Sequence, residues 1–279
     1  MIGFVGLGVM GEPMCRNLAA KSGERVLGYD VNAAPLERLR IAAARSVAEI
    51  AERCDTVFLS LPGVDEVRAV CAALSMRRGS CIVDLSTTTV ALARELHATF
   101  AARAIEFADA PVARTRAAAE SGTLAVMVGA TEAVFNRIRP LLAHMGSDIT
   151  HCGGPGAGQA TKLINNMVLF QNVVALAEAL TLAESAGLSP QRLFETLSTG
   201  SADSFALRNH GMKALIPAEF PERAYSVEYA LKDLGYALDL ARQAGVDLSG
   251  AENARAVLER ARSAGNGAKY FPVLVKTLG

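Results

Sequence analysis

A lysine and two asparagines interrupt an apolar stretch in the second half of the chain, at Lys162, Asn165 and Asn166. On a helix, residues three and four positions apart share a face, so Lys162 and Asn166 would be neighbours with Asn165 beside them. Polar groups are costly to bury without partners, and a buried lysine changes its pKa readily, which suits it to proton exchange. The cluster predicts a functional site, although a lysine near a helix start that reaches solvent gives the same pattern.

A glycine-rich segment at the beginning of the chain has the pattern of a dinucleotide site. It follows an apolar run directly and precedes a helical stretch. The first glycine permits a tight turn, the second lets the backbone approach a pyrophosphate, and the third lets helix and strand pack closely. Free N–H groups and the dipole at the helix N-terminus favour the phosphates. We expect cofactor contacts from Gly6, Leu7, Gly8, Val9, Met10 and Gly11.

An acidic residue, Asp30, ends the second apolar run, 19 residues after Gly11. This is the expected place for the acceptor of a ribose 2′-hydroxyl, and its charge would repel a 2′-phosphate. No arginine comes directly after it, because the next residues are Val31-Asn32-Ala33. We therefore predict NAD as the cofactor, with NADP less favoured. The alternative is that Asp30 only caps a turn before Pro35.

The first half of the chain contains the elements that must position these groups. Short apolar runs bounded by Gly, Pro, Asp or Ser alternate there with helical stretches. The runs cover residues 2–7, 25–30, 55–61, 80–85, 104–110 and 124–129, and the helical stretches include residues 10–21, 35–42 and 89–103. This alternation predicts an α/β fold, with a mostly parallel, Rossmann-type doubly wound sheet in the N-terminal part.

The pattern changes at a cluster of breakers, Gly153-Gly154-Pro155-Gly156-Ala157-Gly158. Residues 159–186 then contain no Pro or Gly, and Gly187 is the expected C-cap of one long helix. That helix is apolar on nearly every side, so we expect it to be buried in its domain or at a subunit interface of a homodimer or homotetramer. We predict an NAD-binding domain over residues 1–153 and an all-helical C-terminal domain over residues 154–279, opened by this interdomain helix.

Composition excludes several classes of protein. The 279 residues are 51% hydrophobic, and 28 basic residues balance 28 acidic ones, so no net charge favours nucleic acid or an anionic membrane. We see neither a charged leader nor an uninterrupted apolar run of membrane-spanning length, and expect no secretory signal and no span. The five cysteines form no CxxC pair, and the histidines lack metal-ligand spacing. We predict a cytoplasmic protein with reduced thiols and no metal.

Taken in order, the motifs resemble those of the β-hydroxyacid dehydrogenase family, which includes 3-hydroxyisobutyrate dehydrogenase, tartronate semialdehyde reductase and relatives of 6-phosphogluconate dehydrogenase. The glycine segment continues with Glu12-Pro13-Met14 and then Asn17-Leu18. Further matches extend over essentially the whole chain: Leu61-Pro62, Asp84-Leu85-Ser86-Thr87, Asp109-Ala110-Pro111-Val112, Gly122-Thr123-Leu124, Gly158-Gln159-Ala160-Thr161-Lys162, Asn165-Asn166 and Lys232-Asp233.

The resemblance implies an oxidoreductase that transfers a hydride between NAD(P) and a CH–OH group. Its substrate would be small and anionic, a short β-hydroxyacid of the 3-hydroxyisobutyrate type. Lys162 would act as the general acid–base, and Asn166 would hold the substrate in the catalytic site. The resemblance also implies cofactor contacts from Leu61, Pro62, Thr87 and Lys232. Ser86 would contact the substrate; the alternative is that Ser86 is only a turn residue at a strand end.

One segment departs from the family. Most members continue Asp-Ala-Pro-Val with Ser-Gly-Gly, whereas this chain has Ala113-Arg114-Thr115. Arg114 offers an always-protonated fork that can grip an anion with two hydrogen bonds. Sulfolactaldehyde reductases carry a similar Gly-Arg-Thr whose arginine helps to hold the sulfonate, and Asn165 fits that comparison also. We expect Ala113, Arg114, Thr115 and Asn165 to bind a carboxylate or, as the alternative, a sulfonate; an exposed loop arginine is the other interpretation.

Two further functions are compatible with the fold. Imine reductases resemble this family but usually lack the lysine of this helix, so Lys162 speaks against that activity. A non-catalytic NAD-binding module would be expected to lose the lysine or the glycines, and both are present.

Overall fold

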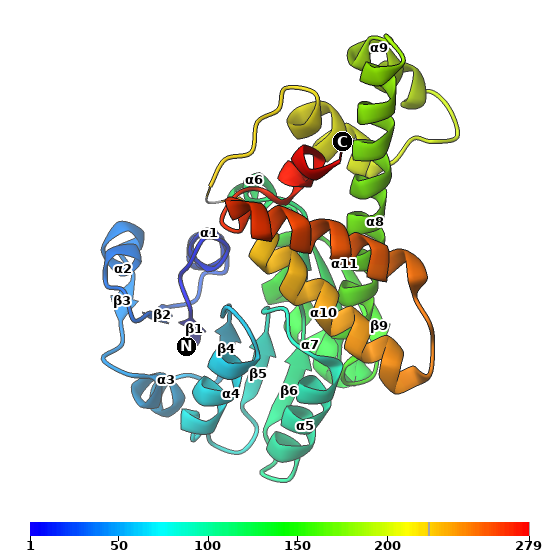
Figure 1. Cartoon of the computed structure of the whole chain (residues 1–279). Coiled ribbons are helices and arrows are strands. Elements are labelled where there is room, and N and C mark those ends of the chain that lie inside the picture. The colour runs from blue at the N-terminus through cyan, green and yellow to red at the C-terminus, as the bar shows by residue number, and fades with distance from the viewer. Residues whose placement is uncertain (223, 279) are drawn as a thin grey trace. The chain divides into compact units, whose positions relative to one another are not determined.

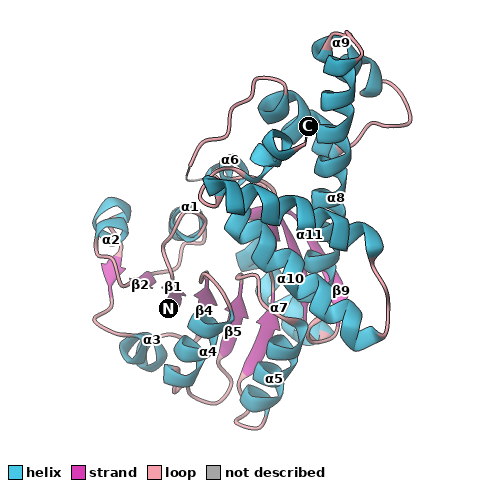
Figure 2. Cartoon of the chain, in the orientation of Figure 1, coloured by secondary structure: helices cyan, strands magenta, loops and turns pink. Residues whose placement is uncertain are grey.

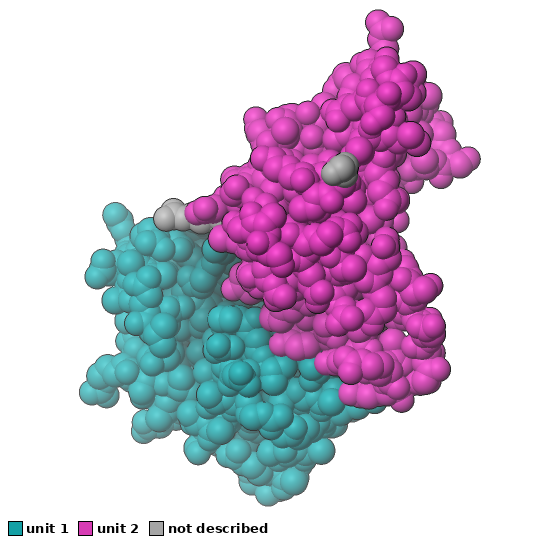
Figure 3. Space-filling view, in the orientation of Figure 1, with its two compact units in different colours: residues 1–162 teal, residues 163–279 magenta. Residues whose placement is uncertain are grey.

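The computed structural model describes residues 1–222 and 224–278. The chain divides into two compact units, residues 1–162 and residues 163–279, which Figure 3 colours separately. Helix α8 (Ala157–Ser185) begins in the first unit and continues into the second.

A nine-stranded sheet forms the centre of the first unit, in the order β3-β2-β1-β4-β5-β6-β8-β7, with β9 paired to β8. Neighbouring strands from β3 to β6 are parallel, whereas β8 is antiparallel to β6 and β7. The central strands are apolar and buried, as expected for parallel strands between two layers of helices. The bounds are β1 (Ile2–Val5), β2 (Val26–Tyr29), β3 (Ala42–Ala43), β4 (Thr56–Leu59), β5 (Cys81–Asp84), β6 (Glu106–Asp109), β7 (Val112–Ala113), β8 (Leu124–Gly129) and β9 (Gly146–Gly153).

Helices cover both faces of this sheet (Figures 1 and 2). Successive side chains of a strand point to opposite faces, so Phe4 and Val5 belong to different cores. One core includes side chains of α1 (Gly11–Lys21), α6 (Arg116–Ser121) and α7 (Glu132–Leu142), and the other of α3 (Val47–Arg53), α4 (Val64–Ala73) and α5 (Val90–Ala101). The predicted doubly wound α/β fold is confirmed.

Capping side chains determine where several of these helices begin. The hydroxyls of Ser46, Thr89 and Thr131 accept a backbone N–H from the first turn of α3, α5 and α7. A cap of this kind typically contributes about 1 kcal/mol. Helix α1 differs, because its N-cap residue Met10 makes no side-chain hydrogen bond to the helix. In its first turn, Glu12 and Met14 donate their N–H groups to the carbonyls of Gly8 and Met10, at 3.0 and 3.3 Å, and Pro13 has no N–H.

The helix predicted over residues 35–42 is wrong in its second half. Helix α2 (Ala34–Leu39) ends where Arg40 adopts a left-handed backbone with φ 53°, and Ala42–Ala43 then forms β3 beside β2. Alanine is the strongest helix former, but helix propensities of ordinary residues differ by less than about 1 kcal/mol per residue, so the pairing with β2 decides the conformation. β9 was equally invisible in the sequence, because its side chains are mostly exposed and polar and do not alternate.

The second unit is built from helices around its own core. After α8 come α9 (Pro190–Leu197), α10 (Val227–Ala244) and α11 (Ser249–Ala261), with π-helical segments at Leu207–Leu215 and Arg262–Asn266 and a 3-10 helix at Phe271–Thr277. The aromatic side chains of Phe170, Phe194 and Phe271 are fully buried in this core. The predicted all-helical C-terminal region is confirmed.

Helix α8 ends as the sequence predicts, since Gly187 has φ 72° and its N–H donates to the carbonyl of Glu184. It is less buried than expected, because Ile164, Val168 and Leu182 are exposed. It is also the one helix, among the described residues, that is long and apolar enough to cross a membrane, and 44% of its most apolar window is buried. Core helices meet the same criterion, so this match says little about a membrane.

Two buried carboxylates face each other at the carboxyl ends of β5 and β6. Asp84 and Asp109 are partners in the strand register. Burial raises the pKa of Asp84 to about 7, with a smaller contribution from the charge of Asp109. Asp84 accepts the Ser86 N–H at 3.0 Å, and Asp109 accepts the N–H groups of Gly156 and Gln159, both at 2.8 Å. The pair therefore connects the sheet to the β5–α5 turn and to the start of α8.

We predict that Asp84→Asn removes a pH dependence of stability. The folded-state pKa of about 7 lies above the usual aspartate pKa of 3.8. At pH values between these two, the folded chain therefore holds a proton that the unfolded chain has lost. The free energy of unfolding must then fall as pH rises through this window. An asparagine side chain cannot ionise, so we expect the variant to exceed the wild type at pH 8 by up to about 4 kcal/mol, and to lie close to it at pH 4.

Urea unfolding at pH 4, 6 and 8 measures this difference. Asp65→Asn, on the exposed face of α4, is the matched control and should leave the pH profile unchanged. A variant that is less stable than the wild type at pH 8 would show that ionised Asp84 stabilises the fold, contrary to this interpretation.

Candidate active site

The three glycines of the first loop occupy distinct environments. Gly6 has φ 91°, and a Cβ there would lie 2.2 Å from the carbonyl oxygen of Ser60. A Cβ on Gly11 would lie 2.0 Å from the carbonyl oxygen of Gly6, so this glycine permits the close approach of helix and loop. A Cβ on Gly8 would meet nothing within 4 Å. Two glycines are thus required by the fold, and the third leaves open space over the loop.

This loop has the features of an anion site. Within the part of the chain that the structure describes, the backbone N–H groups of Gly8, Val9 and Met10 have no hydrogen-bond partner. They precede α1, an eleven-residue helix whose dipole favours negative charge at this end. Unpaired N–H groups beside a glycine without obstruction fit the pyrophosphate of a dinucleotide. The residues present therefore suit the cofactor that the sequence predicts.

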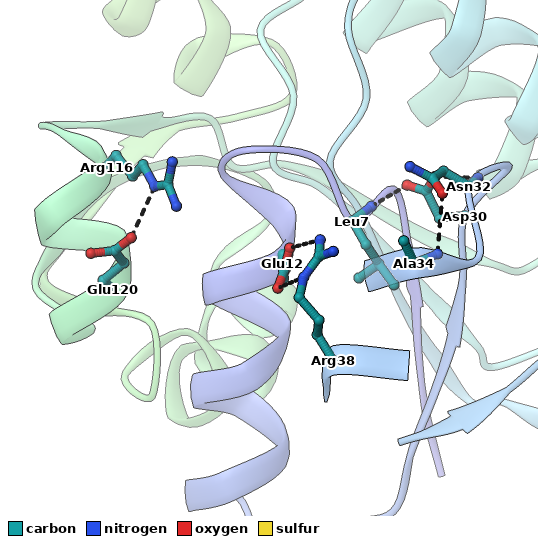
Figure 4. Close-up of polar contacts among 8 residues, drawn as sticks. All are labelled: Leu7, Glu12, Asp30, Asn32, Ala34, Arg38, Arg116 and Glu120. Carbon is teal, nitrogen blue, oxygen red and sulfur yellow. Dashed lines mark hydrogen bonds and ion pairs between the residues drawn. The ribbon is translucent and has the colours of Figure 1, made fainter. Parts of the chain in front are cut away.

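Asp30 lies directly after β2 and is bound to the same loop. One carboxylate oxygen accepts the Leu7 N–H at 2.6 Å, and the other accepts the Asn32 N–H at 2.8 Å (Figure 4). The Asn32 side chain in turn accepts the Ala34 N–H at 3.1 Å. Asp30 thus holds the turn before α2 and the glycine loop together. Each carboxylate oxygen has a second lone pair, so the group can still accept from a ribose hydroxyl.

Two further predicted positions meet beside this loop. The Ser86 hydroxyl is buried and accepts the Leu61 N–H at 2.9 Å, which joins the turns after β4 and β5. Thr87, the next residue, is partly exposed, and Pro62 is exposed. The hydroxyl of Ser86 therefore has a structural role in the first unit.

Gln159 is a functional candidate that the sequence argument passed over. Its side chain is 0% exposed; its amide nitrogen donates to the Ser86 carbonyl at 2.7 Å, and its amide oxygen accepts the Thr88 N–H at 3.0 Å. With its own N–H bound to Asp109, Gln159 holds the start of α8 against the turn after β5. The sequence feature that could have identified Gln159 is its polar side chain between the glycine cluster and Lys162.

Lys162 follows three residues later on α8 and is 8% exposed. It belongs to the first unit, together with the glycine loop and Asp30. A lysine that only reached solvent would be exposed, so its burial agrees with the functional interpretation of the sequence.

Asn166 lies one helical turn further and belongs to a buried network of the second unit. Its amide nitrogen donates to Asp233 of α10 at 2.8 Å and to the Tyr225 hydroxyl at 3.3 Å. Tyr225 also donates to the same carboxylate oxygen of Asp233. Burial, followed by the charge of Asp233, raises the pKa of Tyr225 well above its usual value, so the phenol remains a donor. The amide of Asn166 is thereby held in one orientation.

Lys232 and Asn165 lie at the edge of this network. The Lys232 ammonium is 3.4 Å from the other carboxylate oxygen of Asp233 and 5.2 Å from the ring centre of Tyr229. Asn165 is exposed, and its amide nitrogen donates to the Asn166 oxygen at 3.1 Å. Asp233 and Tyr225 were not singled out as site residues from the sequence, because their contact with Asn166 spans 67 and 59 residues.

Arg114 points to other groups of the first unit. Its guanidinium donates to the Thr123 carbonyl at 2.7 Å and to the Ser147 hydroxyl at 3.0 Å, and lies 2.8 Å from an Asp148 oxygen. Its backbone has φ 88°, which a non-glycine residue adopts at a cost of about 1–3 kcal/mol. Ala113 ends β7, and the Thr115 hydroxyl caps α6, so the expected substrate segment forms a β7–α6 turn.

Comparisons with known proteins point to one family. A family model described as the NAD binding domain of 6-phosphogluconate dehydrogenase matches residues 1–154, and one described as NAD-binding of NADP-dependent 3-hydroxyisobutyrate dehydrogenase matches residues 156–278. The 2-(hydroxymethyl)glutarate dehydrogenase of Eubacterium barkeri is 34% identical over 99% of this chain and 93% of its own length. The 2-hydroxy-3-oxopropionate reductase of Escherichia coli is 32% identical over 88% of this chain and 86% of its own.

A solved structure of Mycobacterium tuberculosis 3-hydroxyisobutyrate dehydrogenase with L-serine superimposes with a TM-score of 0.91 at 33% identity, covering 99% of this chain and 98% of that one. The chain belongs to the β-hydroxyacid dehydrogenase family. This β-hydroxyacid dehydrogenase is therefore an NAD(P)-dependent oxidoreductase that acts on the CH–OH group of small hydroxyacids, which confirms the enzyme class and the cofactor type expected from the sequence.

Imine reductases are similar to this β-hydroxyacid dehydrogenase in fold alone. The enzyme from Myxococcus stipitatus has a TM-score of 0.67 at 19% identity. Among the described residues of the chain, no group of three or more His, Cys, Asp or Glu side chains is arranged to hold a metal ion.

We predict that Asp233→Ala destabilises this β-hydroxyacid dehydrogenase by about 2–3 kcal/mol, because it leaves buried donors of Asn166 and Tyr225 without their acceptor. Tyr225→Phe removes a single hydroxyl and should cost about 1 kcal/mol. Urea unfolding of both variants tests the order. Asp239→Ala, on a more exposed part of α10, is the control. If Asp233→Ala is as stable as the wild type, the hydrogen bonds of this network do not contribute to the free energy of unfolding.

Proposed function

We propose that this enzyme interconverts a short β-hydroxyacid of the 3-hydroxyisobutyrate type and its semialdehyde, with NAD as the hydride carrier and Lys162 as the general acid–base. The observation that carries the proposal is the burial of Lys162 in the compact unit that also contains the glycine loop and Asp30. The relatives named above, which act on related hydroxyacids, support the substrate class.

Lys162 moves the proton in this mechanism. When bound, the nicotinamide gives or takes a hydride at the substrate carbon. In reduction, the Lys162 ammonium protonates the developing alkoxide; in oxidation, the neutral amine accepts the hydroxyl proton. Proton transfer of this kind typically contributes a factor of about 10²–10⁴ in rate. Burial keeps the lysine in one place, which favours a defined proton path.

Asn166 orients the substrate beside Lys162, since the two residues lie four positions apart on α8. Both N–H bonds of its amide are directed to Asp233 and Tyr225, and its oxygen accepts from Asn165. That oxygen keeps a second lone pair, which can accept from the substrate hydroxyl. Asp233 and Tyr225 therefore act as positioning residues. Lys232, in ionic contact with Asp233, is proposed to lie near the nicotinamide.

The substrate is proposed to be a carboxylate. The Mycobacterium tuberculosis structure contains L-serine, which carries a hydroxyl on the carbon next to the α-carbon of a carboxylate. The sulfonate alternative depends on Arg114, whose charge is matched by Asp148 and whose donors contact Thr123 and Ser147. An arginine engaged in this way is a poor anchor for a second anion, so the geometry favours the carboxylate.

Domains and assembly complete the proposal. We place the NAD-binding domain at residues 1–153 and the helical domain at residues 154–279, close to the segments that the two family models match.

We also propose a homodimer or homotetramer, because the apolar side chains of Ile164, Val168 and Leu182 are exposed along α8. Sedimentation equilibrium measures the assembly state. The cytoplasmic location remains a prediction.

We predict that Lys162→Met lowers kcat for reduction of methylmalonate semialdehyde by about 10²–10⁴-fold, because no other group takes over the proton. Its affinity for NADH, measured by calorimetry, should fall much less. Lys213→Met makes the same chemical change at an exposed position and is the matched control. A Lys162→Met enzyme with the kcat of the wild type would exclude Lys162 as the acid–base.

A substrate panel separates the carboxylate from the sulfonate. We expect methylmalonate, tartronate or succinic semialdehyde to give a higher kcat/KM than sulfolactaldehyde, and Arg114→Ala to change the KM for the best carboxylate less than about threefold. Should sulfolactaldehyde be the best substrate, and should Arg114→Ala raise its KM by about tenfold or more, Arg114 must leave Asp148 to bind the sulfonate.

A further inference from the structure

An ion pair joins the two helices that follow the cofactor-binding turns. Arg38 of α2 donates through Nε and Nη2 to the two carboxylate oxygens of Glu12 on α1, at 2.9 and 2.7 Å. The pair is at the surface, with 57% of the Arg38 side chain and 20% of the Glu12 side chain exposed. Figure 4 shows the Arg38 side chain extending from α2 towards the first turn of α1. Nothing in the proposed reaction uses either residue.

The position of the pair connects it to the adenosine end of the dinucleotide site. Glu12 lies in the first turn of α1, directly after the loop with the unpaired N–H groups. Arg38 lies in the last turn of α2, a short helix that begins just after Asp30 and Asn32. The guanidinium is therefore held beside the first turn of α1, and its side chain comes from the helix that follows the Asp30 turn.

The surrounding charges make Arg38 the principal partner of Glu12. Its hydrogen bonds hold the pKa of Glu12 below its usual value, and the charges of Arg16 and Arg116 add to this effect. Arg116, however, donates to Glu120 at 2.9 Å. Glu12 is thus ionised at neutral pH, and it occupies two donors of a guanidinium that would otherwise be free to bind an anion.

We propose that Glu12 is a specificity-determining residue that favours NAD by holding Arg38, and that Arg38 binds the 2′-phosphate of NADP once Glu12 no longer holds it. The planar fork that now binds two carboxylate oxygens has the geometry to bind two phosphate oxygens. The inference rests on the proposed dinucleotide site, and it adds a second carboxylate to Asp30 as the basis of the preference.

Isothermal titration of NAD⁺ and NADP⁺ to the full-length enzyme tests the proposal without any substrate. The quantity compared is the ratio of the Kd for NADP⁺ to the Kd for NAD⁺, because general effects on dinucleotide binding cancel in it. We expect Glu12→Gln to lower this ratio by about tenfold, the effect of one charge-assisted hydrogen bond. Glu12→Gln/Arg38→Ala should return it to the wild-type value. Exposed ion pairs contribute little to stability, so these variants are expected to fold.

Glu37→Gln is the matched control. Glu37 is exposed on α2 and acts on Arg38 through its charge, with no hydrogen bond to it among the described residues. Its variant should leave the ratio unchanged. An unchanged ratio in Glu12→Gln, a gain that survives Arg38→Ala, or an equal gain in Glu37→Gln would each overturn the proposal. Wild-type enzyme that binds neither dinucleotide would instead overturn the cofactor site itself, and this inference with it.

Discussion

The buried carboxylate of Asp109 holds the end of the sheet to the beginning of the long helix. It accepts the N–H groups of Gly156 and Gln159, and the surrounding backbone is so close that a Cβ on Gly129 would lie 2.5 Å from one of its oxygens. A Cβ on Gly158 would lie 2.4 Å from the carbonyl of Met127. Burial raises the pKa of Asp109, and these N–H groups oppose that rise. The start of α8 is therefore positioned by hydrogen bonds to one carboxylate and by two glycines.

Three polar side chains follow one another along the first turns of α8. Gln159 binds the turn after β5, and Lys162 is buried three residues later. One turn further on, Asn166 donates hydrogen bonds to Asp233 and Tyr225 in the second unit. The hydrogen bonds of Gln159 and Asn166 offset the cost of burying their amides. A helix start held this firmly is what an acid–base lysine needs, because small displacements of a catalytic group cost rate.

The sequence could predict the parts of this structure that depend on local pattern. Alternating apolar runs and helical stretches indicated the doubly wound sheet. The spacing of Gly6, Gly8 and Gly11 indicated the turn between β1 and α1, and Asp30 was expected beside that turn, where it accepts the Leu7 N–H. Long-range hydrogen bonds were out of reach. Gln159 contacts Ser86 across 73 residues, and Glu12 contacts Arg38 across 26, with no periodicity to signal either contact. Arg114 was expected to face an anion, but the side chains of β9 that surround it lie on a strand without a strand signature.

The most direct measurement of the central claim is chemical rescue of the Lys162→Ala enzyme. Small primary amines of different pKa are added while NADH oxidation is followed with the preferred semialdehyde. If Lys162 is the general acid–base, the variant should be slow alone, the amines should restore turnover, and the restored rate should depend on amine pKa. Wild-type turnover by Lys162→Ala without any amine would contradict the account, because the proton would then have another donor.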